Sequence, residues 1–268
     1  MHHRLRWLLA LLALVGFVAA GCGDDDDAAT ASSSTTSTSA DTVTGDLHVF
    51  AASSLTEAFT AMGKRFESAH PNVKVTFSFA ASSALAQQVN DGGPADVLVT
   101  ADASNMKKVT DAGYATDPKT IARNRLSILV GKGNPKGITS LADLGTRGVV
   151  FVLCAPEVPC GKFGAAALAK ANVTAKPASL EENVKAVVAK VTLGEADAGI
   201  VYVTDVKAAG DKAQGVDIDI AGDPSLEASY PIAVTKQAAN ADAAKAWIDY
   251  VLSSDGQQAL ASFGFLAP

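Results

Sequence analysis

The sequence predicts an α/β protein in which buried strands alternate with helices around a doubly wound, largely parallel sheet. Three observations lead to this class. Short apolar runs recur through residues 46–268, apolar residues at helical spacing follow most of them, and small or glycine-rich turns separate the two. Ligands of such sheets bind beyond the carboxyl ends of the strands, so the turns that follow strands are the first candidates for a functional site.

The first strand and the first helix meet at a pair of serines. Residues 47–52 have the composition of a buried strand, and apolar residues at helical spacing begin at Leu55. Ser53 and Ser54 lie between them, and Ser54 with Glu57 matches the S-x-x-E capping box, which predicts that Ser54 caps the helix. Free backbone N–H groups and a hydroxyl at a helix start suit an anion, although serine also caps many helices that bind nothing.

The same arrangement of strand, small turn and helix recurs along the chain. Ser82 lies in the second such turn, Cys160 lies in a later one beside Gly161, and Tyr202 falls at the carboxyl end of a strand. Ser179 and Glu182 form a second capping box, which predicts a helix start. Further strands are predicted at 73–79, 95–100, 125–130, 148–153, 198–205 and 229–234, and further helices at 84–90, 104–112, up to 171, 179–193, 241–252 and 254–263.

The N-terminus has the pattern of an export signal followed by a linker. Residues 1–22 combine a basic start, an apolar run and small residues before Cys22. Small residues before a cysteine resemble the lipobox of bacterial lipoproteins, which predicts lipidation of Cys22; the alternative is an ordinary cleaved signal. Residues 23–45 contain four consecutive aspartates and a Ser/Thr/Ala tract, a composition that predicts a disordered tether.

Charge and cysteine content narrow the possible partners. The chain carries a formal net charge of −6 at pH 7 and no basic cluster, so we expect no nucleic acid partner, and local dipoles would have to hold any bound anion. Cys154 and Cys160 form an even pair in a chain with an export signal, which predicts a disulfide. A two-cysteine metal site is the alternative, but no histidine or third thiol lies near them in the sequence.

Six motifs together resemble those of the periplasmic molybdate-binding proteins, the substrate-binding components of ABC importers. In chain order they are VFAASSLTEAF, FSFAASSALAQQV, GGPADVLVTAD, APEVPCGKFG, LEENVKAVV and GIVYVTD. The resemblance implies a two-lobed type II periplasmic-binding-protein fold, in which each lobe is a mainly parallel sheet flanked by helices and the ligand lies in the cleft between the lobes. Lobe 1 would comprise residues 46–124 and 230–268, and lobe 2 residues 125–229.

The resemblance also implies a ligand, its binding residues and a partner. Ser54 and Ser82 would donate hydroxyl and backbone hydrogen bonds, Tyr202 its phenolic O–H, and Cys160 and Val184 their backbone N–H groups. At position 160 the family leads us to expect a small residue such as alanine, but a backbone donor tolerates the change. The ligand would be molybdate or tungstate, with no cofactor, and the protein would be a lipid-anchored monomer outside the cytoplasmic membrane that delivers it to an ABC permease.

Two other functions remain as alternatives. A tetrahedral dianion only accepts hydrogen bonds and suits a site made of donors, whereas phosphate near neutral pH usually carries a proton; sulfate and phosphate are the first alternative. A serine hydrolase is the remote one, because beyond the signal only His48 and His70 are candidate histidine bases. We expect Asp102, Asp205 and Glu157 to be helix caps or surface groups rather than metal ligands.

Overall fold

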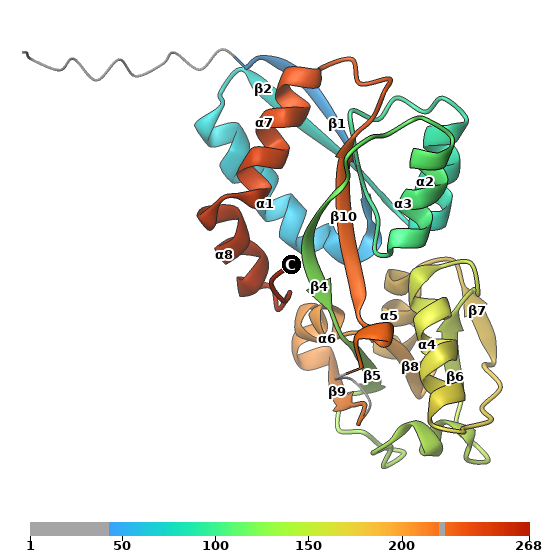
Figure 1. Cartoon of the computed structure of the whole chain (residues 1–268). Coiled ribbons are helices and arrows are strands. Elements are labelled where there is room, and N and C mark those ends of the chain that lie inside the picture. The colour runs from blue at the N-terminus through green and yellow to red at the C-terminus, as the bar shows by residue number, and fades with distance from the viewer. Residues whose placement is uncertain (1–42, 220–222) are drawn as a thin grey trace, which may run out of the picture. The chain divides into compact units, whose positions relative to one another are not determined.

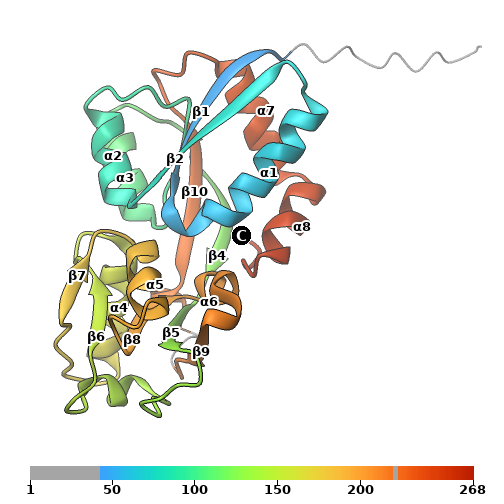
Figure 2. The same ribbon diagram turned by 180° about the vertical axis from the view of Figure 1, so that it is seen from behind.

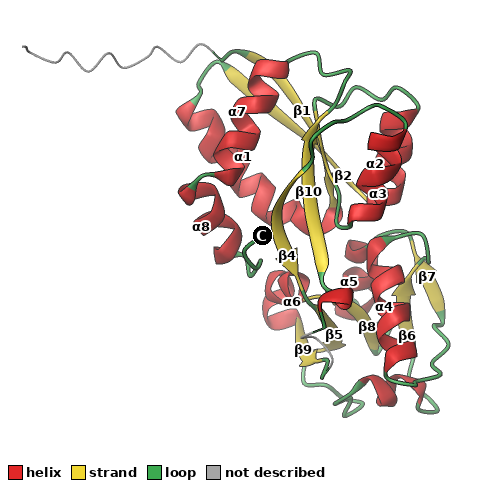
Figure 3. Ribbon diagram, in the orientation of Figure 1, coloured by secondary structure: helices red, strands yellow, loops and turns green. Residues whose placement is uncertain are grey.

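The computed structural model describes residues 43–219 and 223–268, so the predicted export signal, Cys22 and most of the predicted tether lie outside the described residues. The described chain is built on two five-stranded sheets, each with helices packed on its faces (Figures 1 and 3). We call each sheet with its helices a lobe. Within these residues, no helix has the length and apolar composition needed to cross a membrane.

The first lobe contains the sheet of spatial order β2-β1-β3-β10-β4. These strands are β2 (Val73–Ala80), β1 (Gly45–Ala52), β3 (Val97–Val99), β10 (Ala228–Val234) and β4 (Lys119–Asn124). Helices α1 (Thr56–Ala69), α7 (Ala241–Leu252) and α8 (Ser254–Ser262) lie on one side, and α2 (Ser82–Asn90) and α3 (Ala103–Asp111) on the other (Figure 1). Trp247 is fully buried and packs edge-on against Phe59 and Phe66, so aromatic packing holds α7 against α1.

The second lobe contains the sheet of order β7-β6-β8-β5-β9. Its strands are β7 (Ser179–Glu181), β6 (Phe151–Cys154), β8 (Ala198–Tyr202), β5 (Leu126–Gly131) and β9 (Ala213–Asp217), and its helices are α4 (Pro159–Lys170), α5 (Val184–Thr192) and α6 (Val203–Ala209). In both sheets two neighbouring pairs are parallel and two are antiparallel. The α/β class is therefore confirmed, but the sheets are mixed rather than mainly parallel. Strand β10 pairs antiparallel with β3 and β4 in the first sheet, and β5 pairs antiparallel with β8 and β9 in the second.

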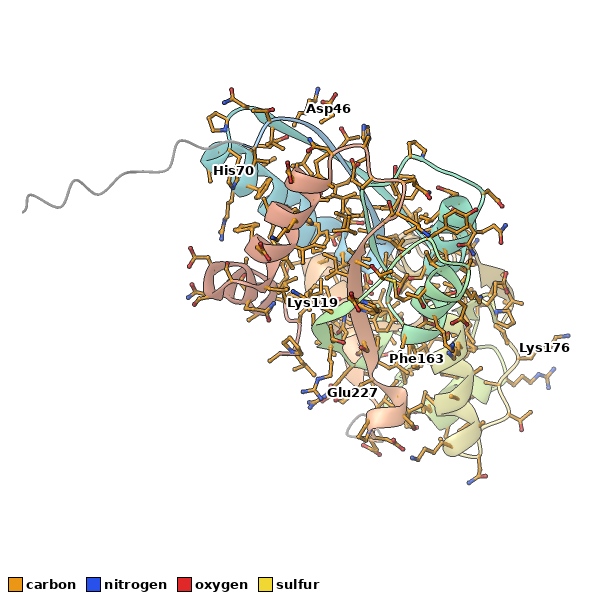
Figure 4. All side chains as sticks on the ribbon, turned by 45° about the horizontal axis from the view of Figure 1, so that its top comes forward. Asp46, His70, Lys119, Phe163, Lys176 and Glu227 are labelled. Carbon is orange, nitrogen blue, oxygen red and sulfur yellow. A yellow bond between two sulfur atoms is a disulfide. The ribbon has the colours of Figure 1, made fainter. Side chains whose placement is uncertain are left out.

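The chain crosses between the lobes in two neighbouring places. It passes from β4 to β5 at Arg125 and returns into β10 after Glu227, and β4 and β10 lie side by side as an antiparallel pair (Figure 3). The Glu227 carboxylate, labelled in Figure 4, pairs with Arg123 at 3.4 Å and Arg125 at 3.3 Å. These ion pairs join the outgoing and returning strands beside the crossings.

Two predicted elements need correction, and two strands were missed. The helix predicted at 179–193 is a strand, β7, followed by α5, because Ser179–Glu181 pairs with β6 and the Asn183 side chain caps α5 by accepting the Ala186 N–H at 3.0 Å. The strand predicted at 198–205 ends at Tyr202, where α6 begins. Strands β4 and β9 were not predicted.

The predicted cap of the first helix is also wrong. A short 3-10 turn at Ser53–Leu55 precedes α1, which begins at Thr56, and Ser54 makes no capping hydrogen bond to the helix backbone. Its hydroxyl is bonded instead to Tyr230, which lies 176 residues later in the chain. A tertiary contact has replaced the local one that the S-x-x-E pattern indicates.

Candidate functional site

A small cavity lies between the two lobes, where the turns that follow β1 and β2 face the starts of α4 and α5 and the end of β8. All five residues named from the sequence line it: Ser54, Ser82, Cys160, Val184 and Tyr202. The cavity has room for about one water molecule. The cavity between the lobes is therefore a small one.

The Ser82 hydroxyl lines this cavity, and its oxygen already has a donor from the backbone. The residue begins α2 directly after β2 and is 1% exposed. Its Oγ accepts the backbone N–H of Ala101, which follows β3, at 2.8 Å. Because a backbone N–H only donates, the Ser82 oxygen must accept, and its own hydrogen remains available for another acceptor.

Ser54 is held by a residue that the sequence did not indicate. Its Oγ lies 2.9 Å from the Tyr230 hydroxyl, and both side chains are buried. Tyr230 was predicted only as part of a strand, and no local pattern around it indicates a role. Ser54 and Tyr230 are 176 residues apart in the sequence, so their contact becomes visible only in the folded structure.

Tyr202 carries the polar atom that most directly points to a ligand. Its side chain is 1% exposed, and among the described residues its hydroxyl has no hydrogen-bond partner. Burial, with the nearby Tyr230 and the carboxylates of Asp205 and Asp102, raises the pKa of this phenol well above its usual value of 10.0. The hydroxyl therefore keeps its proton and is a donor without an acceptor, an arrangement that is unfavourable unless a ligand supplies one.

Cys160 and Val184 lie in the first turns of α4 and α5, where backbone N–H groups have no partner within the helix and the helix dipole favours negative charge. Val184 could not have offered such a group in the predicted helix 179–193, because it would have lain in the second turn. Because α5 in fact begins at Val184, the N–H of this residue lies in the first turn of the helix, as a backbone donor requires.

The predicted disulfide between Cys154 and Cys160 is present, and it ties the end of β6 to the first turn of α4. The two sulfur atoms are thus bonded to each other, which argues against the alternative of a two-cysteine metal site. Gly161 allows this turn to be tight, because a Cβ there would overlap the carbonyl oxygens of Cys154 and Ala155. Among the described residues, no three His, Cys, Asp or Glu side chains are grouped to hold a metal ion.

Two lysines of the second lobe bridge to the first beside the cavity without entering it. Helix α5 lies below the start of α1 in Figure 2. Lys185 on α5 contacts Glu57 on α1 at 2.7 Å and the buried Asp205 at 2.9 Å. Burial lowers the pKa of Lys185, but the two carboxylates outweigh it and the net shift is upward, so the ammonium stays charged. Lys162 on α4 donates to Ser104 at 2.8 Å.

The lining side chains are themselves all uncharged. Asp102 and Asp205 act as helix caps, as expected: Asp102 accepts the Asn105 N–H at 2.8 Å and Asp205 accepts the Tyr202 N–H at 3.2 Å. Neither Ser54 nor Ser82 contacts a general base, since the partner of Ser82 is a backbone N–H and that of Ser54 is a tyrosine. The arrangement offers hydrogen-bond donors to a small acceptor and contains no activated nucleophile.

Comparison with known proteins places these features in a family. Residues 47–266 match the bacterial extracellular solute-binding proteins. Molybdate-binding protein ModA of Mycobacterium tuberculosis is 39% identical over 222 residues, which cover 82% of this chain and 84% of that protein. ModA of Haemophilus influenzae is 31% identical over 235 residues, covering 82% and 89%. The solved periplasmic molybdate-binding protein of Azotobacter vinelandii, at 18% identity, aligns with a TM-score of 0.69 over 83% of this chain and 99% of that one, which confirms the predicted type II fold.

Proposed function

This chain belongs to the bacterial extracellular solute-binding proteins and, within them, to the ModA family, and on that premise we propose that it binds molybdate in the cavity between its lobes and delivers it to an ABC permease. As a solute-binding protein it is not an enzyme, and it works outside the cytoplasmic membrane. Tungstate has the same shape and charge, so we expect it to bind as well.

The observation that carries this proposal is the convergence of five candidate donors from separate turns on one cavity whose lining side chains carry no charge. Ser54, Ser82 and Tyr202 would donate their hydroxyls, and Cys160 and Val184 their backbone N–H groups. The oxygens of a tetrahedral dianion accept hydrogen bonds from every side, and no cation is needed where enough dipoles point inward. Hydrogen phosphate has a proton that would need an acceptor, and sulfate is smaller than molybdate.

We further propose that binding closes the two lobes around the ligand. Lobe 1 would comprise residues 46–124 and 230–268, and lobe 2 residues 125–229, although strand β10 of the first sheet already begins at Ala228. The hinge would lie at the paired crossings beside Arg125 and Glu227. Ser54 and Ser82 come from the first lobe, whereas the other three donors come from the second. Rotation about the hinge would therefore assemble both halves of the site, and the closed monomer would be the form that a permease recognises.

We also propose that Cys22 anchors the protein to the outer face of the cytoplasmic membrane. The support is the sequence pattern of residues 1–22 and the polar tract that follows. Replacing Cys22 by serine should release the protein from the membrane fraction into the medium or periplasm. Retention of the C22S variant in washed membranes would contradict the anchor and leave the binding proposal intact.

The binding proposal is tested by a panel of oxyanions against the purified protein. Molybdate and tungstate should raise the melting temperature and give saturable heats in calorimetry, with a stabilisation of about 2.7 kcal/mol at one hundred times the dissociation constant. Ser82→Ala should weaken molybdate binding, whereas Ser83→Ala, a matched change at a neighbour that does not line the cavity, should leave it unchanged. Binding of sulfate or phosphate as tight as that of molybdate would refute the assignment.

A further inference from the structure

A buried row of polar side chains lies behind Ser54 and leads back to the crossing strands. Ser54 Oγ is 2.9 Å from the Tyr230 hydroxyl, which is 3.4 Å from Asn124 Nδ2. The same amide nitrogen donates to Thr204 Oγ1 at 2.8 Å. All four side chains are buried, so their hydrogen bonds are made with each other and not exchanged with bulk water.

The direction of these hydrogen bonds is fixed at one end by the backbone. The N–H of Arg125 donates to Asn124 Oδ1 at 3.0 Å, and because this N–H only donates, the atom facing it must be the amide oxygen. The amide nitrogen therefore faces Tyr230 and Thr204. It has hydrogens and no lone pair to offer, so the Tyr230 hydroxyl cannot give its proton to Asn124.

The proton of Tyr230 is consequently left with Ser54 Oγ as its acceptor. Burial raises the pKa of Tyr230, so that this proton stays in place at neutral pH. Ser54 Oγ then accepts the hydrogen bond from the Tyr230 hydroxyl, and the hydrogen of Ser54 itself is free to point into the cavity. The result matches Ser82, whose oxygen is occupied from behind by the Ala101 N–H.

We propose that Asn124 and Tyr230 are positioning residues that orient the Ser54 hydroxyl as a donor, and that they thereby select an oxyanion that carries no proton. This inference rests on the proposed function and deepens it by naming what sets the polarity of one donor. A Ser54 hydroxyl that could rotate would present a lone pair as easily as a hydrogen, and would then accept the proton of hydrogen phosphate. A fixed donor has nothing to offer that proton.

The test is a double-mutant cycle with molybdate and hydrogen phosphate as probes, using calorimetry for molybdate and competition for phosphate. Tyr230→Phe removes the proton donor of Ser54 and should weaken molybdate binding by about tenfold, the effect of one hydrogen bond. The affinity ratio of molybdate to hydrogen phosphate should fall with it. In a Ser54→Ala background the same change should have no further effect, whereas in the matched Ser82→Ala background it should keep its full effect.

The outcomes separate this inference from the proposed function. If the unmodified protein does not bind molybdate, the proposed function is wrong. If it binds molybdate but Tyr230→Phe has no effect, weakens both anions equally, or acts as strongly without the Ser54 hydroxyl as with it, the positioning role is wrong and the function stands. Should Tyr230→Phe fail to fold by its melting curve, Asn124→Ala in the same cycle gives the same test, because it removes the amide that dictates the direction.

Discussion

Tyr202→Phe should change stability and affinity in opposite directions. The substitution removes one oxygen atom that is buried and, among the described residues, unpartnered. An unsatisfied buried polar group is unfavourable by about 1–3 kcal/mol, so the ligand-free variant should be as stable as the original or more stable. For a protein of this size each kcal/mol corresponds to about 2–4 °C in melting temperature.

Molybdate binding should weaken in the same variant. A hydrogen bond to a charged acceptor contributes about 1.5–3 kcal/mol, which corresponds to an increase of about 10–150-fold in the dissociation constant. Calorimetry gives the constant directly, and melting curves with and without molybdate give the stability. The molybdate-dependent rise in melting temperature should therefore shrink, although the ligand-free melting temperature does not fall.

Tyr250→Phe is the matched control, because its hydroxyl is also buried without a described partner but lies on α7, outside the cavity. It should leave the dissociation constant unchanged. If Tyr202→Phe destabilises the ligand-free protein and leaves the dissociation constant unchanged, the phenol is a structural group and the reasoning from its missing partner fails.

Three further predictions concern closure, the disulfide-linked turn and pH. Glu57→Gln removes the carboxylate that Lys185 contacts across the lobes and should speed molybdate release by up to about fivefold, the range expected for an exposed ion pair. The difference should disappear in 1 M salt, and Asp111→Asn, which breaks a comparable ion pair inside one lobe, should not change the release rate. Gly161→Ala should lower both melting temperature and affinity, because the added Cβ overlaps backbone oxygens of the turn; a fully active, fully stable variant would show that the turn can shift. Since burial raises the pKa of Tyr202, its proton is retained below pH 10 and lost only at higher pH, so the dissociation constant for molybdate should not change from pH 6.5 to 9. A change in this constant with a midpoint between pH 6 and 8, measured by calorimetry, would instead reveal a titrating group at the site.

The sequence predicted those parts of the fold that depend on local pattern. Ser54, Ser82 and Cys160 each lie at a helical start that follows an apolar strand, and each of these places could be located from a few neighbouring residues. The motif at Ser179 and Glu182 failed for the opposite reason. It satisfies the local rule for a helix start, but the backbone of Ser179–Glu181 is taken up by pairing with β6, and the helix begins only after Asn183.

The positioning of the serine hydroxyls could not be predicted in the same way. Tyr230 is 176 residues from Ser54 and 106 residues from Asn124, and nothing in the sequence around any of them indicates that they meet. Contacts of this kind depend on how two crossing strands pair. Sequence patterns can therefore suggest which residues face a ligand, whereas the direction of their hydrogen bonds requires the folded structure.

The covalent link between β6 and the first turn of α4 makes preparation history a variable in any measurement on this protein. Cys160 lines the cavity, and its position is secured by the bond to Cys154. Material recovered from a reducing cytoplasm would lack that bond, whereas exported material would have it. Two batches of identical sequence should then differ in affinity, and thiol titration before each binding assay would tell them apart.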